Sequence, residues 1–190
     1  MNVNSEITIE EIQHLIGRNI LAFQFIEILL KDINLKKNGK GTEKELKNKK
    51  KKIMKMSLGD LVNHKKLQLL DSNINLDDGN LELTDPILSF NFLPDTESLE
   101  QLQAKLSELS TDRNILVHKL RFNFKVETNL GKIDAKHFLN HQYENLIPLS
   151  KELKHISDVL TTRQNSFKTV IESDQFLAEI ENIRQSSNKL

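Results

Sequence analysis

The chain has 190 residues, with 27 acidic and 27 basic side chains and 37% hydrophobic residues. This length and composition suit one domain with a modest core. The absence of cysteine excludes disulfide bonds, a thiolate nucleophile and a cysteine-ligated zinc site.

The first residues are polar and have neither the basic nor the apolar segment of a signal peptide. No apolar run reaches the length of a membrane span. The sequence therefore predicts a cytoplasmic protein without a membrane partner.

Hydrophobic periodicity predicts helices along nearly the whole chain. From Glu6 to Asn34 apolar residues recur every three or four positions, and the one omitted step falls on the polar Asn19. The lysine-rich stretch from Glu43 to Lys55 has few apolar residues and predicts either a frayed helix or a loop. Ser57, with Asp60 three residues later, is typical of a helix start.

Residues 71–95 are predicted to form an irregular acidic loop. They are rich in Asp and Asn and contain Asp78-Gly79 and two prolines, Pro86 and Pro94, which break regular structure. A short strand or hairpin around residues 81–83 is the alternative for part of this segment.

A second long helix is predicted to begin between Asp95 and Ser98. Arg113 stands at one position of its apolar stripe, whose other members are Leu99, Leu102, Leu106, Leu109, Leu116 and Leu120. A third long helix is predicted from Asp134 to Thr162, with a kink at Pro148. A last helix contains the apolar residues between 167 and 183. These elements predict an all-α fold, a bundle of about four to five helices in one domain over residues 1–190.

The zero net charge conceals an uneven distribution. Residues 31–66 contain thirteen lysines against four acidic residues, a net charge of +9, whereas residues 67–100 contain eight acidic residues and no Lys or Arg. Local fields rather than the total charge steer a polyanion toward a protein. The run Lys49, Lys50, Lys51 and Lys52 therefore predicts either a contact with RNA phosphates or a solvated loop.

Arg113, Asn114 and His118 are the candidate catalytic residues. An unpaired buried charge is costly, so Arg113 is predicted to lie in a cleft or to face an anion. Asn114 and His118 are four residues apart and share one helix face, with Arg113 beside them. Arginine binds phosphate oxygens through a planar fork, and histidine exchanges protons near neutral pH. These groups would suit attack of a 2′-hydroxyl on an RNA phosphodiester.

The segment Arg113-Asn114-Ile115-Leu116-Val117-His118 resembles the Arg-polar-x-x-x-His motif of the HEPN superfamily (higher eukaryotes and prokaryotes nucleotide-binding). The residues preceding it, Leu109-Ser110-Thr111-Asp112, are also similar to that family. Near the N-terminus, Gly17 to Gln24 followed by Glu27 is similar to a bacterial HEPN-like group. The resemblance covers residues 6–165, which would form the core, with residues 166–190 as a C-terminal helix.

The resemblance implies a HEPN-like bundle and a twofold homodimer in which the Arg and His residues meet in a shared cleft. It implies an endoribonuclease that needs neither metal nor cofactor, often a toxin or a phage-defence effector. RNA is then the substrate, and a cognate antitoxin or regulatory protein is a further expected partner. One antitoxin-modified subgroup has a tyrosine shortly after the motif histidine. Lys119 and Leu120 follow here, which argues against that mode of control.

Two alternatives remain at this point. In one, the protein is a non-catalytic HEPN-like module that binds RNA or a protein. In the other, the motif is purely structural: Arg113 pairs with Asp112 or Glu108 on the surface, and His118 is an ordinary packed side chain.

His137, His141 and Glu144 have the spacing of zinc ligands on one helix face. However, Phe138 stands where metalloproteases have the glutamate that follows their first histidine. The sequence therefore favours exposed histidines on a solvated face, and no metal site is predicted.

Overall fold

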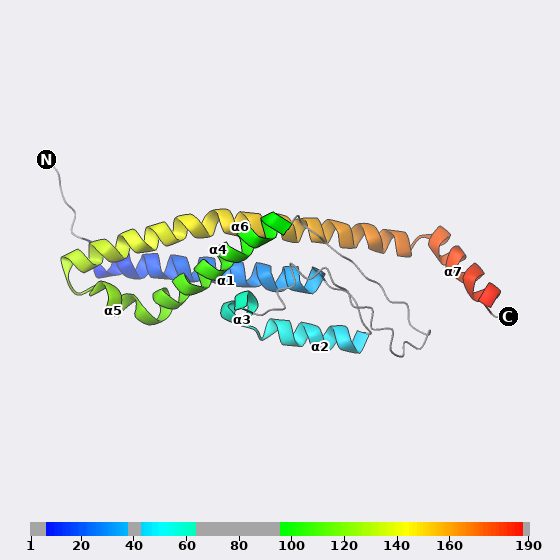
Figure 1. The fold of residues 1–190 in the computed structure, drawn as a ribbon, viewed down its shortest axis with the longest axis horizontal. Helices are drawn as coiled ribbons and strands as arrows, with labels where there is room; N and C mark the ends of the chain where they lie inside the picture. Colours follow the sequence, from blue (N-terminus) through cyan, green and yellow to red (C-terminus); the bar gives the residue numbers. More distant parts are fainter. Residues whose placement is uncertain (1–6, 38–42, 64–95, 188–190) are drawn as a thin grey trace.

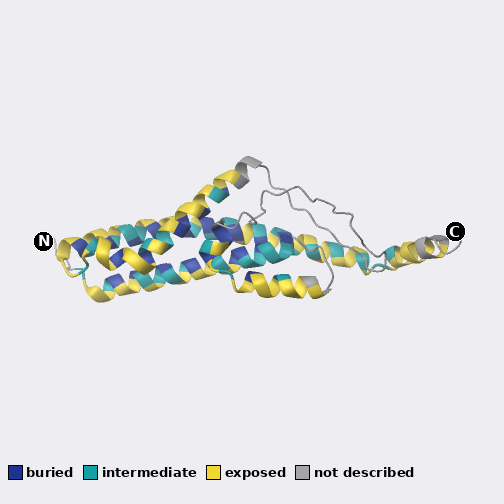
Figure 2. Ribbon diagram, turned by 60° about the horizontal axis from the view of Figure 1, so that its bottom comes forward, coloured by how far each residue is buried: buried dark blue, intermediate teal, exposed yellow. Residues whose placement is uncertain are grey.

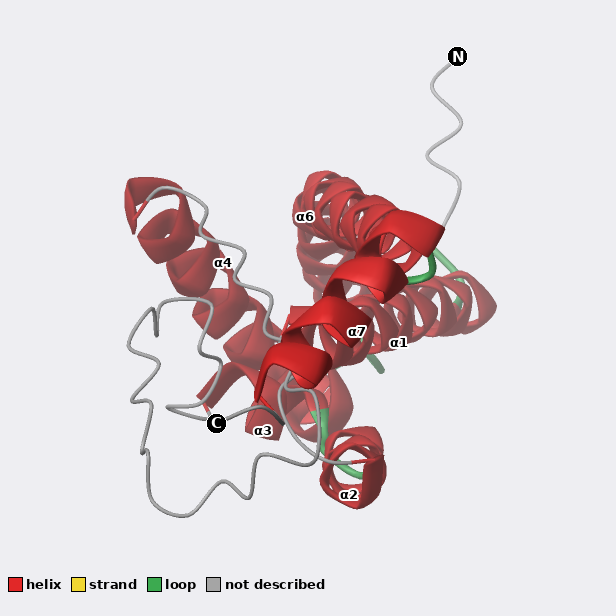
Figure 3. Cartoon of the chain, turned by 90° about the vertical axis from the view of Figure 1, so that its right-hand side faces the viewer, coloured by secondary structure: helices red, strands yellow, loops and turns green. Residues whose placement is uncertain are grey.

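The structure, a computed structural model, describes residues 7–37, 43–63 and 96–187. All regular elements in these ranges are helices, which confirms the predicted all-α fold (Figure 3). They are α1 (Ile9–Lys37), α2 (Glu43–Met54), α3 (Leu58–Asn63), α4 (Thr96–Asn114), the π-helix η1 (Ile115–Lys119), α5 (Leu120–Phe124), α6 (Asn129–Ile171) and α7 (Asp174–Ser187). The predicted acidic loop at residues 71–95, with its alternative strand, lies outside the described residues.

Helices α1 and α6 lie side by side and form the centre of the bundle, while α4 crosses them obliquely (Figure 1). Both helices bury side chains spaced three or four residues apart, as the periodicity predicted. Those of α1 include Ile12, Leu15, Phe23, Ile26, Leu30 and Ile33, and those of α6 include Leu139, Leu146, Leu149 and Leu153. On the outer face of α1, Leu21, Phe25 and Ile28 are exposed.

Helices α2 and α3 lie on the opposite side of α1 from most of α6 (Figure 3). The lysine-rich stretch is helical rather than a loop, and it is held to the core by the buried Ile53. The predicted helix start is confirmed: Ser57 Oγ accepts a hydrogen bond from the Asp60 N–H at 3.3 Å, and Asp60 Oδ2 accepts one from the Ser57 N–H at 2.9 Å. Glu27 of α1 accepts a third bond, from the Leu58 N–H at 3.1 Å, and so docks α3 on α1.

Helix α6 is longer than the sequence predicted. It begins at Asn129 rather than Asp134 and ends at Ile171 rather than Thr162, and Pro148 lies inside it without ending it. Thr128 caps its start by accepting a hydrogen bond from the Gly131 N–H at 3.0 Å. No glycine or proline stands between residues 162 and 171 to end the helix.

The C-terminal part of the bundle extends beyond the core. The last buried residue of α6 is Leu160, and α7 is mostly exposed (Figure 2). No helix in the described ranges combines the length and apolar character that crossing a membrane requires.

Candidate functional site

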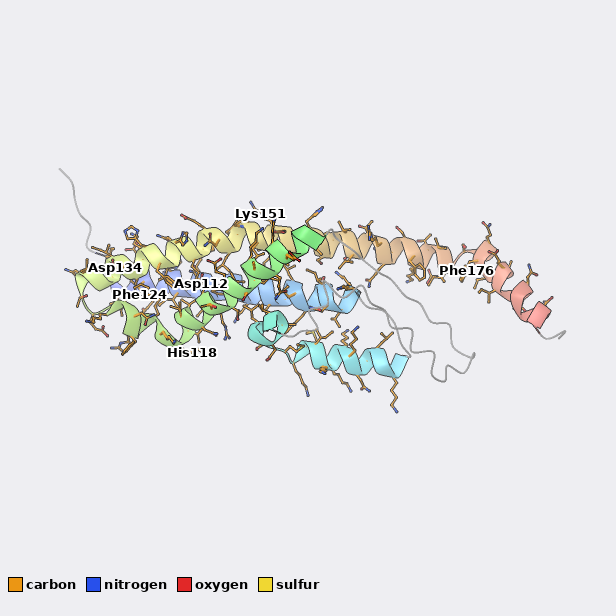
Figure 4. The ribbon with its side chains drawn as sticks, in the orientation of Figure 1. Asp112, His118, Phe124, Asp134, Lys151 and Phe176 are labelled. Carbon is orange, nitrogen blue, oxygen red and sulfur yellow. The ribbon has the colours of Figure 1, made fainter. Side chains whose placement is uncertain are left out.

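The three predicted catalytic residues lie where α4 passes into η1. Arg113 and Asn114 are the last residues of α4, and His118 lies within η1. Asn114 and His118 are exposed, and Arg113 is half-buried. His118 lies on the outer side of this segment, whereas Asp112 lies on the side that faces α6 (Figure 4).

The π-helix changes which side chains face solvent after Asn114. Its i→i+5 hydrogen bonds enclose one residue more than the i→i+4 bonds of an α-helix. The side chains after η1 are therefore rotated about the helix axis by about 100° from where an uninterrupted α-helix would place them. Leu116 and Leu120 remain in the core, while Val117, His118 and Lys119 are exposed. Short π-helical segments occur often at functional sites. Periodicity based on the α-helix predicted the buried leucines but not this widened turn.

Asn19, the polar residue in the apolar stripe of α1, anchors the motif helix. Asn19 is fully buried, and its Nδ2 donates to the Leu139 carbonyl at 2.8 Å and to Gln142 Oε1 at 2.9 Å. Gln142 Nε2 in turn donates to the carbonyl of Asp112 at 3.1 Å. This buried chain of hydrogen bonds joins α1, α6 and α4 one residue before Arg113. Removing it would leave buried polar groups without partners, which costs about 1–3 kcal/mol for each group.

Arg18 completes the hydrogen bonds of Asn19. Its Nε donates to Asn19 Oδ1 at 3.2 Å, and its Nη2 donates to Asn140 Oδ1 at 3.1 Å. The guanidinium also lies over the ring of Tyr143, at 3.9 Å from the ring centroid. Arg18 is therefore engaged between α1 and α6 and is not a candidate for substrate binding.

The motif side chains are not neutralised by the part of the chain that the structure describes. Within that part, Arg113, Asn114 and His118 make no hydrogen bond or ion pair through their side chains. The predicted alternative in which Arg113 pairs with Asp112 or Glu108 is not observed. The alternative of a packed His118 is wrong, because the π-helix turns this residue to the surface.

The carboxyl of Asp112 is a poor counterion for Arg113. Burial raises its pKa, the negative charge of Glu108 raises it further, and His141 opposes both effects. The guanidinium of Arg113 is not among the groups that shift this pKa, so Asp112 and Arg113 do not form a close ion pair.

A basic segment continues from the motif through α5. Residues 113–125 contain four Lys or Arg residues and no acidic residue. Lys119 and Lys125 are exposed, and Arg121 forms an ion pair with Glu127 at 2.6 Å. The hydrogen bond from Arg121 lowers the pKa of Glu127. We did not predict these residues as part of the site, although the absence of acidic residues between 113 and 126 was a usable signal.

The predicted RNA-binding lysines lie elsewhere. They belong to α2, and Figure 1 shows α2 and α5 toward opposite ends of α1. Lys50, Lys51 and Lys52 are exposed, whereas Lys49 is half-buried and burial lowers its pKa. The structure therefore does not bring this run to Arg113.

The three residues with the spacing of zinc ligands are exposed to solvent, as predicted. His137, His141 and Glu144 are exposed on α6, and His141 Nε2 lies 3.4 Å from Asn145 Nδ2. Across residues 7–37, 43–63 and 96–187, no group of three or more His, Asp or Glu side chains could hold a metal ion.

No protein-family model, curated protein or solved structure matches the chain. The motif and the surroundings that the fold gives it are therefore the features that point to a function.

Proposed function

We propose that the protein is a metal-independent endoribonuclease of HEPN type that uses Arg113, Asn114 and His118. The supporting observation is the exposed Asn114 and His118 beside a half-buried Arg113, on a helix anchored to the core through Gln142. An enzyme of this kind would act as a toxin or a phage-defence effector.

The proposed reaction needs only proton transfer and charge stabilisation. Neutral His118 accepts the proton of a 2′-hydroxyl, and the 2′-oxygen forms a bond to phosphorus. The bond from phosphorus to the 5′-oxygen breaks, and that oxygen takes up a proton from a protonated histidine, which a second copy of the chain would supply. Arg113 binds the non-bridging oxygens, where charge accumulates in the transition state, and Asn114 orients the phosphate or His118. The products are a 2′,3′-cyclic phosphate and a 5′-hydroxyl.

Incubation of the purified chain with single-stranded RNA in EDTA tests this proposal. We expect cleavage without added metal. RNA binding with no cleavage in any buffer would instead favour the non-catalytic binding module.

We expect the protein to be a homodimer in solution. Each chain supplies one motif histidine, while the reaction needs a group that accepts a proton and a group that donates one, and a twofold partner would supply the second. Sedimentation at micromolar concentration measures this. If the protein is a monomer at this concentration and still cleaves RNA, one copy of the motif is sufficient.

The exposed lysines of α2 can be tested separately from the motif. If Lys50, Lys51 and Lys52 bind RNA, changing all three to Gln should reduce the steepness with which log affinity falls as log salt rises. The expected decrease is about 0.7 for each single-strand phosphate that the variant no longer neutralises. The rate of cleavage of bound RNA should not change, because these residues transfer no proton.

A charge-matched control changes Lys151, Lys154 and Lys168 of α6 to Gln, since all three are exposed. If the salt dependence of RNA affinity changes equally in both triple variants, it reflects the total charge of the protein rather than a contact with α2. The α2 lysines would then be an ordinary solvated face.

A further inference from the structure

Phe122 is an exposed aromatic side chain next to the candidate site. It is 87% exposed, although residues on both sides of it pack on the core. Leu120, two residues earlier, is buried, and the ring of Phe124, two residues later, lies 5.0 Å from that of Phe138 on α6. α5 is therefore fixed in place while it presents Phe122 to solvent. Phe122 is more exposed than any other large apolar side chain in the described ranges.

The surroundings of Phe122 are cationic. Lys119 and Lys125 are exposed three residues before and after it, and Arg113 and His118 precede it in α4 and η1. Glu127, the nearest acidic residue in the sequence, pairs with Arg121. His118 and Phe122 are four residues apart in the chain, on either side of the junction between η1 and α5. An aromatic ring among cations is the combination with which proteins bind single-stranded nucleic acid, because the bases stack on the ring while the cations contact the phosphates.

A second copy of the chain fits this surface less well. Packing the same segment of a partner directly on Phe122 would bring Lys119 and Lys125 of both copies into contact, and like charges in contact disfavour an interface. In the proposed dimer the two motifs would instead face each other across a cleft that RNA fills, so that their cations contact phosphates. Lysine is also depleted in the centre of protein interfaces. A polyanion removes this repulsion, so the charge around Phe122 favours RNA.

We propose that Phe122 is a stacking platform for an unpaired RNA base beside the bond that His118 acts on. The site would then favour single-stranded RNA, because a paired base must first be unstacked and unpaired, which costs free energy, before it reaches the ring. This inference rests on the proposed function for the position of the bond, but stacking itself requires only binding.

Binding measurements in the His118→Ala background test the inference without loss of the RNA to cleavage. The probes are a short uridine oligonucleotide, an RNA duplex of equal charge, and an oligonucleotide that carries the fluorescent base 2-aminopurine. Phe122→Ala should weaken binding of the single strand by about 5- to 150-fold and leave duplex binding unchanged. It should also abolish the quenching of 2-aminopurine that stacking causes, and Phe122→Tyr should restore both properties.

Phe25→Ala is the matched control, since Phe25 is also exposed but lies on α1. It should bind the single strand as the parent does. The inference is overturned if Phe122→Ala binds the single strand normally, if duplex binding falls equally, or if the variant becomes monomeric in sedimentation, which would assign Phe122 to a contact between copies.

Failure of the proposed function would be distinguishable from failure of this inference. If RNA bases stack on Phe122 but the protein never cleaves RNA, the stacking proposal holds and the endoribonuclease proposal is wrong. If cleavage depends on His118 but no base stacks on Phe122, only the stacking proposal is wrong.

Discussion

Gly131→Ala is expected to lower the melting temperature by about 6–12 °C, the result of a destabilisation of about 3 kcal/mol. A Cβ atom at Gly131 would lie 1.9 Å from the Phe124 carbonyl oxygen and 2.3 Å from that of Lys125. Both oxygens belong to the backbone, which cannot rotate away as a side chain can. The turn also contains Lys125 at φ 44°, so it is already constrained. Thermal unfolding followed by circular dichroism measures the effect.

Gly17→Ala is the matched control for that substitution. Gly17 lies in the middle of α1 with no atom within 4 Å of the position that a Cβ would occupy. Alanine should therefore stabilise the helix by about 1 kcal/mol. A melting temperature for Gly131→Ala equal to or above that of the wild type would refute the close approach of α5 and α6 at this turn.

His118→Ala is expected to lower single-turnover RNA cleavage by about 10²- to 10⁴-fold, the usual loss when a general acid–base group is removed. The melting temperature should change little, because His118 is exposed and its side chain bonds to no residue in the described ranges. His137→Ala, which removes an exposed histidine from α6, should cleave at the wild-type rate.

Arg113→Ala should also depress cleavage at saturating RNA, because its proposed role is at the charge that develops in the transition state. Near-wild-type cleavage by folded His118→Ala would remove this residue from the mechanism. A loss of equal size in His137→Ala would point to a general effect of exposed histidines.

Much of the fold could be predicted from spacing alone. The buried face of α1 and the leucines of α4 follow the helical period, and the helix start at Ser57 has a recognisable pair of side chains. These features depend on residues near one another in the chain. The capping of α3 by Glu27 does not, since the two bonded residues are 31 positions apart.

The surroundings of the motif were harder to predict, because distant residues determine them. The polar position Asn19 was noticeable in the sequence, but its partner Gln142 is 123 residues away. Nothing in the spacing of Ile115 to Lys119 distinguishes a π-helix from an α-helix, since apolar residues four apart fit both. The exposure of His118 depends on that turn.

The ends of the RNA products formed in EDTA test the central claim most directly. If Arg113, Asn114 and His118 promote attack by the 2′-hydroxyl, the wild-type protein should release fragments with 2′,3′-cyclic phosphate and 5′-hydroxyl ends, and His118→Ala should not. Fragments with 3′-hydroxyl and 5′-phosphate ends, or cleavage that appears only when a divalent metal is added, would contradict the account.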